Sequence, residues 1–97
     1  MATTWGNTPP VILVAEDEPT TRLLVVRLLE RAGYAVLQAV DGEQALECLG
    51  GAHASQPADL VISDIRMPRL DGFALAQRLR NTAPDTPVIM LTAHDDK

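Results

Sequence analysis

The chain has 97 residues, which leaves room for one domain of the usual size, roughly 100 to 200 residues, and excludes a second. Hydrophobic residues make up 46% and charged residues 22% of the sequence, a balance typical of a folded globular protein. The formal charge of -5 disfavours nucleic-acid binding by this segment and favours metal cations. Since the single cysteine, Cys48, cannot form an internal disulfide, we expect a reducing compartment.

Residues 1–10 end in Asn7-Thr8-Pro9-Pro10, whose residue types favour turns. They lack the basic start and apolar stretch of a secretory signal, so we interpret them as a flexible lead-in to one domain over residues 11–97. No apolar run approaches the roughly 18 residues that a membrane span requires. We therefore expect a soluble cytoplasmic protein with no membrane contact.

From Val11 onward, short β-branched runs alternate with longer segments of helical spacing, a pattern typical of parallel α/β units. The first strand is predicted over residues 11–15, and Glu16-Asp17-Glu18 follow its C-terminal end. A helix then starts at Pro19 and ends at Gly33. Its three- and four-residue steps run through Thr21, Leu24, Val25, Leu28, Leu29 and Ala32.

The remaining pattern predicts three more strands and two more helices. In chain order these are a strand over 34–39, a short helix from Asp41-Gly42 through Leu49 to Gly50-Gly51, a strand over 59–63 that ends at Asp64, a helix over about 72–81 with Leu75, Ala76 and Leu79 facing inward, and a strand over 88–91 that ends at Thr92-Ala93. Right-handed crossovers would place helices on both faces of one sheet. The ligand site of such a sheet lies beyond the C-terminal ends of its strands.

Glu16, Asp17 and Asp64 are the carboxylates that this pattern places at that edge, beside Thr92. Two unit charges about 5 Å apart repel by roughly 3 kcal/mol at an effective dielectric near 20, so three carboxylates require a cation or a raised pKa. Oxygen ligands without Cys or His favour Mg²⁺ or Mn²⁺ and suit phosphoryl transfer, in which a carboxylate can be the nucleophile. Composition leaves open which acid would take that role.

Several ordered motifs together resemble a response-regulator receiver domain, from about Val11 to Ala93. They are Glu16-Asp17 after the first strand, Ala39-Val40-Asp41-Gly42 with Ala45-Leu46, Asp64-Ile65-Arg66-Met67-Pro68 with Leu70-Asp71-Gly72, and Thr92-Ala93. The resemblance implies a flavodoxin-like doubly wound parallel sheet with the strand order 2-1-3-4. The family's fifth strand and last helix have no counterpart here, so we expect a domain incomplete at its C-terminus.

The resemblance also implies a function. Asp64 would accept a phosphoryl group from the phosphohistidine of a sensor histidine kinase or phosphotransfer protein, and the change would switch a surface that partners read. Asp17 and Asp64 would bind Mg²⁺ directly and Glu16 through water, and the backbone carbonyl of Arg66 would be a further ligand. Such a protein would catalyse only its own phosphorylation and dephosphorylation, and would not otherwise be an enzyme.

Four further expectations concern residues around the phosphoacceptor. Thr92 would be the switch hydroxyl, and the small Ala93 would leave room for the phosphate. Met67-Pro68 and Asp71-Gly72 would shape the loop after Asp64 without taking part in the chemistry.

The sequence departs from the family pattern in lacking its active-site lysine and its aromatic switch residue. Lys97, the only lysine, follows Thr92 by five residues, too few to reach a further strand, and receives no role. An alternative is therefore an interaction or dimerisation module that is not phosphorylated and self-associates through the exposed edge at 88–91 or a helix face. A phosphohydrolase would need a second acid two residues beyond the nucleophile, where Arg66 stands.

The other residues with metal-binding or reactive side chains receive structural interpretations. Glu18 is interpreted as a solvated acid at a helix start. His53, His94 and Cys48 fit no zinc spacing, so we place the histidines at the surface and pack Cys48 near the second helix.

Overall fold

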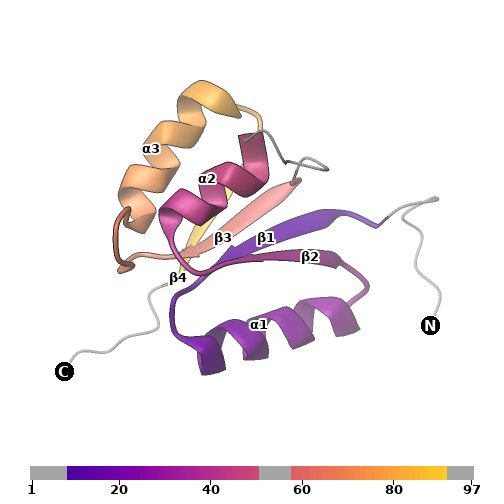
Figure 1. Cartoon of the computed structure of the whole chain (residues 1–97). Helices are drawn as coiled ribbons and strands as arrows, with labels where there is room; N and C mark the ends of the chain where they lie inside the picture. The colour runs from indigo at the N-terminus through magenta and orange to yellow at the C-terminus, as the bar shows by residue number, and fades with distance from the viewer. Residues whose placement is uncertain (1–8, 51–57, 92–97) are drawn as a thin grey trace.

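The computed structural model describes residues 9–50 and 58–91, and its element order matches the predicted alternation (Figure 1). The elements are β1 (Val11–Ala15), α1 (Pro19–Arg31), β2 (Ala35–Ala39), α2 (Gly42–Gly50), β3 (Leu60–Asp64), α3 (Gly72–Thr82) and β4 (Val88–Leu91). The largest difference that bears on the site is at β3, which lies one residue later than predicted. Asp64 is therefore the last residue of the strand rather than the first residue after it, and it pairs with Leu91 of β4.

The four strands form one parallel sheet in the order β2-β1-β3-β4, which confirms the predicted strand order 2-1-3-4. β1 lies in the middle, with Ala15 opposite both Ala39 of β2 and Ser63 of β3. This register brings the C-terminal ends of the three strands to one edge of the sheet. The loops that leave those ends, before α1, α2 and α3, are consequently neighbours in space.

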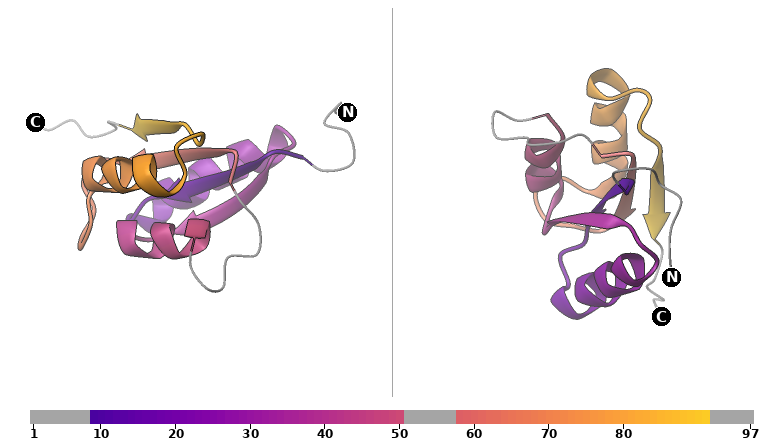
Figure 2. Two further views of the ribbon diagram at one scale, coloured as in Figure 1. Left: turned by 90° about the horizontal axis from the view of Figure 1, so that it is seen from above. Right: turned by 90° about the vertical axis from the view of Figure 1, so that its right-hand side faces the viewer.

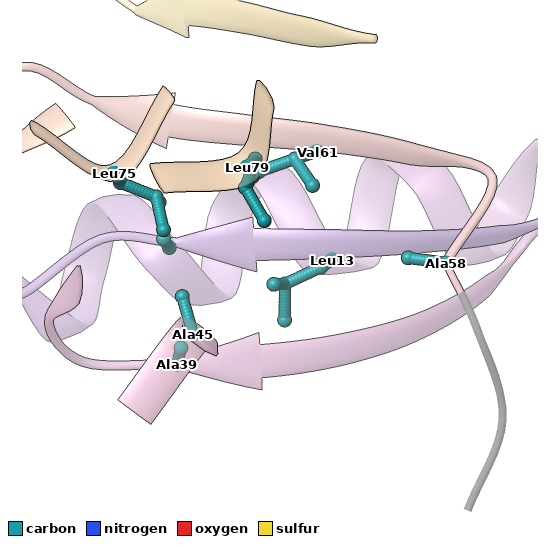
Figure 3. Close-up of a cluster of buried hydrophobic side chains, with 8 residues drawn as sticks. Leu13, Ala39, Ala45, Ala58, Val61, Leu75 and Leu79 are labelled. Carbon is teal, nitrogen blue, oxygen red and sulfur yellow. The ribbon is translucent and has the colours of Figure 1, made fainter. Parts of the chain in front are cut away.

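Helices cover both faces of the sheet, with α1 on one face and α2 and α3 on the other (Figures 1 and 2). Alternate residues of β1 pack into the two core layers on either side of the sheet, because successive side chains of a strand point to opposite faces. Leu13 and Ala15 pack beneath α2 and α3, with Leu75 and Leu79 of α3 fully buried against them (Figure 3). β1 is thus buried on both faces, as its uninterrupted apolar sequence predicts.

The buried face of α1 is narrower than its apolar sequence suggests. Val26 packs against Ile12 and Val14 of β1 on the second face of the sheet. Leu24 and Leu28 belong to the predicted three- and four-residue series, yet they are 59% and 57% exposed. In α3 the inward positions are confirmed for the two leucines, whereas Ala76 is half-buried.

The start of α1 confirms the interpretation of Glu18. Its exposed side chain accepts a hydrogen bond from the backbone N–H of Thr21 at 2.8 Å, and Pro19 occupies the first turn. This hydrogen bond stabilises the ionised carboxylate, so the pKa of Glu18 is lowered. No helix in the described ranges has the length and apolar character needed to cross a membrane.

Candidate functional site

Three carboxylates meet where β1 and β3 end, as the sequence predicts. Ala15 and Ser63 are partners in the parallel ladder, so the next residues, Glu16 and Asp64, emerge side by side. Asp17 follows on the loop to α1, and one oxygen of each of the three carboxylates lies within 4.8 Å of the others. The strand register alone is enough to bring together residues almost fifty positions apart in the sequence.

The carboxylates differ in their access to solvent and in how the backbone orients them. Glu16 and Asp64 are only 3% and 2% exposed, whereas Asp17 is exposed. The Oε2 atom of Glu16 accepts a hydrogen bond from the N–H of Glu18 at 3.0 Å, and Oδ1 of Asp64 accepts one from the N–H of Ile65 at 2.8 Å. Two buried carboxylates therefore have fixed positions, and the third is open to solvent.

Burial raises the pKa of Glu16, and the nearby charges of Asp64 and Asp17 raise it further. The hydrogen bond from Glu18 opposes this change but does not cancel it. The protein therefore holds Glu16 where its ionised form is disfavoured. A cation beside the three oxygens would relieve both the repulsion and part of the desolvation.

Arg22 of α1 holds the backbone of the same loop. Its Nη1 donates to the carbonyl of Glu16 at 2.9 Å, and its Nε donates to Oε1 of Gln38 on β2 at 3.2 Å. The N–H of Glu16 donates to the carbonyl of Ala39 at 3.0 Å, so both backbone polar groups of Glu16 are bonded. Sequence reasoning missed Arg22, although its place six residues after Glu16, in the first turns of a predicted helix, is a signal that could have suggested the contact.

The loop between Asp64 and α3 is closed at its base. The N–H of Gly72 donates to the carbonyl of Ile65 at 2.8 Å, and Asp71 caps α3 by accepting from the N–H of Ala74 at 2.8 Å. A Cβ atom on Gly72 would collide with the carbonyl oxygen of Asp64. The glycine therefore allows α3 to begin directly against the end of β3, as expected of a residue that shapes this loop.

A second charged contact lies beside this loop. Asp41, at the start of α2, is 3% exposed, and its Oδ2 accepts from both Nε and Nη2 of Arg69, at 2.9 and 2.7 Å. The N–H of Gln44 donates to Oδ1 of Asp41, and this hydrogen bond, followed by those of Arg69, lowers the pKa of Asp41. Nothing local in the sequence pointed to this pair, because its members are 28 residues apart.

Residues 12–97 match the model of the response regulator receiver domain family. The chain belongs to this family. The observed strand order and the meeting of Glu16, Asp17 and Asp64 thus have a common explanation, since both agree with the receiver resemblance.

Relatives of this receiver occur in proteins of different size. The response regulator MprA of Mycolicibacterium vanbaalenii is 41% identical over 87 residues, which cover 90% of this chain and 36% of that protein. The sensor protein EvgS of Escherichia coli (strain K12) is 45% identical over 83 residues, covering 86% of this chain and 7% of that protein. The receiver thus spans about a third or less of these two relatives.

The structural comparison agrees with the sequence comparison. The response regulator TrrA of Thermotoga maritima, solved in complex with Mg²⁺-BeF, superposes with a TM-score of 0.77 at 38% identity. The match covers 89% of this chain and 71% of that one. The receiver therefore shares both its fold and a substantial part of its sequence with a protein whose structure was solved with Mg²⁺-BeF.

The remaining site predictions fall into two groups. Thr92, Ala93, Lys97, His53 and His94 lie outside the described residues. Arg66 is exposed in the loop after Asp64, and its carbonyl stays a predicted ligand. Cys48 is half-buried against the core beneath α2, as expected, and burial raises the pKa of its thiol.

Proposed function

We propose that this receiver is a phosphoacceptor whose Asp64 takes a phosphoryl group from the phosphohistidine of a sensor histidine kinase or phosphotransfer protein. The observation that carries the proposal is the Glu16, Asp17 and Asp64 cluster at the C-terminal edge of a receiver sheet. A relative of this chain is itself named a sensor protein, which supports a kinase as the partner class. The cytoplasm, where a kinase would meet a soluble receiver, is the proposed location.

The donor set fits Mg²⁺, with Mn²⁺ as a substitute, because it consists of hard oxygen ligands with one side open to solvent. Asp17 and Asp64 would bind the ion directly and Glu16 through water, and the carbonyl of Arg66 would complete the protein ligands. When bound, the ion supplies positive charge that neutralises the phosphoryl oxygens. The structure of TrrA with Mg²⁺-BeF supports this assignment by similarity.

The bonds that form and break in the transfer belong to the phosphodonor and Asp64. A carboxylate oxygen of Asp64 attacks phosphorus, an O–P bond forms, and the P–N bond of phosphohistidine breaks. The bonding electron pair leaves with the departing imidazole nitrogen. The ring ends neutral because its other nitrogen already carries a proton, or because the departing nitrogen takes one from water. Water later hydrolyses the acyl phosphate and restores Asp64, so the protein acts only on its own phosphorylation state.

Two residues that follow β4 in the sequence would link this chemistry to the surface. Thr92 would turn its hydroxyl toward the phosphoryl group, and the small side chain of Ala93 would leave space for that group. Both roles rest on the family resemblance. The resulting population shift would alter the surface that a partner reads.

The proposal is tested by intact-mass measurement after incubation with Mg²⁺ and a small phosphodonor such as acetyl phosphate. One added phosphate is expected on the wild-type protein, none on Asp64→Asn, and none when the metal is chelated. Asp59→Asn, which changes an exposed carboxylate at the opposite end of β3, is the matched control and should be labelled like the wild type. Equal labelling of Asp64→Asn would refute the assignment.

A second candidate function is an interaction or dimerisation module that is not phosphorylated. The observation that favours it is the exposure of large apolar side chains on α1 and β4, where Leu24, Leu28 and Ile89 are 59%, 57% and 49% exposed. A Mg²⁺ titration followed by amide chemical shifts separates the two functions. Unchanged shifts at Asp17 and Asp64 in millimolar Mg²⁺ would favour this second candidate.

A further inference from the structure

The loop of residues 65–71, which follows Asp64, is attached to α2 at its far end. Arg69 directs two guanidinium N–H groups at a single oxygen of Asp41, at 2.9 and 2.7 Å. The Arg69 side chain is 59% exposed, but the Asp41 side chain is only 4% exposed. Removing the arginine would leave a buried carboxylate without its cation, which makes this pair more consequential than an ordinary surface ion pair.

The backbone at this contact is both unusual and close. Arg69 has φ of 69°, the only positive value at a non-glycine residue in the described ranges. A left-handed conformation at such a residue persists only when its surroundings hold it there. At the same place Gly42 approaches Leu70 so closely that a Cβ atom on Gly42 would collide with the carbonyl oxygen of Leu70. The loop and the start of α2 therefore fit each other at backbone level.

The two ends of the same loop are held differently. At the base, the Gly72 N–H to Ile65 carbonyl hydrogen bond closes the loop, and the N–H of Ile65 donates to the Asp64 carboxylate. At the apex, a hydrogen bond from the N–H of Leu70 to the carbonyl of Pro68 makes a turn. Besides the packing of Leu70, the apex is joined to α2 by Arg69, which has its two short hydrogen bonds to Asp41 and a longer ion pair, at 3.8 Å, with Glu43.

We propose that Arg69 is a positioning residue for the Asp64 site, acting through its ion pair with Asp41. The pair holds the loop of residues 65–71 against α2 and thereby fixes the backbone that surrounds the Asp64 carboxylate and carries the Arg66 carbonyl. This inference rests on the proposed function, because the positioned groups are those that would bind the metal. Residues around the ligands of a metal site are known to set its affinity by orienting those ligands.

Two substitutions break the pair of Arg69 with Asp41, and Arg69→Met also removes the longer ion pair with the exposed Glu43. Arg69→Met keeps the length of the side chain but removes its donors and charge. Asp41→Asn keeps an oxygen that can accept from the N–H of Gln44, so the cap of α2 is preserved while the ion pair is lost. Arg69→Lys keeps the charge with a single donor group, and Arg80→Met removes an exposed arginine of α3 as the matched control.

The first measurement is amide hydrogen exchange of the full chain in metal-free buffer. The amide of Gly72 should exchange about tenfold faster in Arg69→Met and in Asp41→Asn, because the loop opens more often. The double variant should exchange no faster than Arg69→Met, since that substitution already removes the interaction with Asp41. Unchanged exchange at Gly72 in both variants would overturn the inference directly, whatever the protein does with metal or phosphate.

The second measurement is the Mg²⁺ dissociation constant, from amide chemical shifts at temperatures where every variant is folded. It should rise about fivefold in Arg69→Met, in Asp41→Asn and in the double variant, less in Arg69→Lys, and not in Arg80→Met. A purely structural pair would lower the melting temperature without moving this constant. A wild-type affinity in the folded variants would therefore overturn the inference and leave the proposed function intact.

Failure of the proposed function has a different signature. If the wild-type protein bound no Mg²⁺ and accepted no phosphate, both the phosphoacceptor assignment and the positioning role would fall together. If the wild-type protein bound and reacted while the pair variants matched it, only the positioning role of Arg69 would fall.

Discussion

Glu16 lies buried between strand ends, next to two other carboxylates, in a position that opposes its ionisation. Burial and the charges of Asp64 and Asp17 raise its pKa above the ordinary value of 4.5. A carboxyl group with a raised pKa contributes fully to folding stability at pH values below its ordinary pKa, where it is protonated. That contribution is lost as the pH rises through the folded-state pKa. In metal-free protein, raising the pH above the ordinary pKa of Glu16 therefore costs stability at this residue.

Glu16→Gln should consequently stabilise the metal-free protein at pH 7, by roughly 1 kcal/mol. Glutamine keeps the length of the side chain and an oxygen that can accept from the N–H of Glu18, but it carries no charge. Urea unfolding in the presence of a chelator measures the effect, which should shrink as the pH approaches 4. Glu30→Gln, at an exposed position of α1, is the control.

The same substitution should have the opposite effect when the metal is present. At the proposed site, millimolar Mg²⁺ should stabilise the wild-type protein by binding to the folded state, and this gain should be smaller in Glu16→Gln. A variant that was less stable than the wild type even without metal would contradict the account of Glu16 as a destabilising metal-site residue.

At the scale of elements, the junction between β3 and α3 depends on the absence of a side chain at Gly72. A Cβ atom there would collide with the Asp64 carbonyl and lie 3.0 Å from Sδ of Met90 and 3.1 Å from Cα of Ile65. Alanine is the better helix former by about 1 kcal/mol, so at an open position it would stabilise α3. Here the backbone must instead move away from the end of β3.

Gly72→Ala should therefore destabilise the protein, by about 1 to 3 kcal/mol, and slow the labelling of Asp64 by acetyl phosphate. Thermal unfolding and intact-mass time courses measure the two effects. Gln77→Ala, at an exposed position of the same helix, should leave both nearly unchanged. Full stability of Gly72→Ala would show that the junction yields easily and does not constrain Asp64.

The elements themselves could be predicted because each carries a local signal. Continuous apolar runs indicate the strands, and Pro19 and Gly33 mark the ends of the first helix. The end of β3 was misplaced by one residue because a carboxylate after an apolar run resembles a loop residue, whereas Asp64 pairs with Leu91 inside the sheet. The buried face of α1 could not be deduced, since apolar residues occupy both of its sides.

Part of the candidate site could likewise be predicted from the sequence, and part of it could not. The Glu16, Asp17 and Asp64 cluster was predictable because parallel strands deliver their C-terminal ends to a common edge. The contacts that hold the cluster and its loops were not predictable from pattern alone. Arg69 and Asp41 meet only because α2 and the loop before α3 are adjacent in the folded molecule, and no periodicity records that adjacency.

At the scale of the whole molecule, one edge of the sheet carries two carboxylates with opposite effects on stability. Glu16 follows β1 and has a raised pKa, whereas Asp41 follows β2 and has a lowered one. The pKa of Asp41 is lowered chiefly by the hydrogen bond from the N–H of Gln44 and then by Arg69, while burial acts in the opposite direction. Because its pKa is depressed, this carboxylate stabilises the fold at pH values above its ordinary pKa of 3.8. The contribution is lost as the pH falls through the folded-state pKa.

Asp41→Asn should therefore reduce the unfolding free energy by about 1 to 2 kcal/mol at pH 7 and by progressively less below pH 4. The low end of this range is favoured because water screens the exposed guanidinium of Arg69. Urea unfolding at pH 7, 4 and 2.5 gives the profile, with Asp85→Asn at an exposed position as the control for losing one negative charge. The curves of Asp41→Asn and wild type should converge in acid, because protonated Asp41 and asparagine carry the same charge beside Arg69. Curves that stayed parallel from pH 7 to 2.5 would mean that ionisation of Asp41, with its hydrogen bonds from Gln44 and Arg69, contributes nothing to the pH dependence of stability.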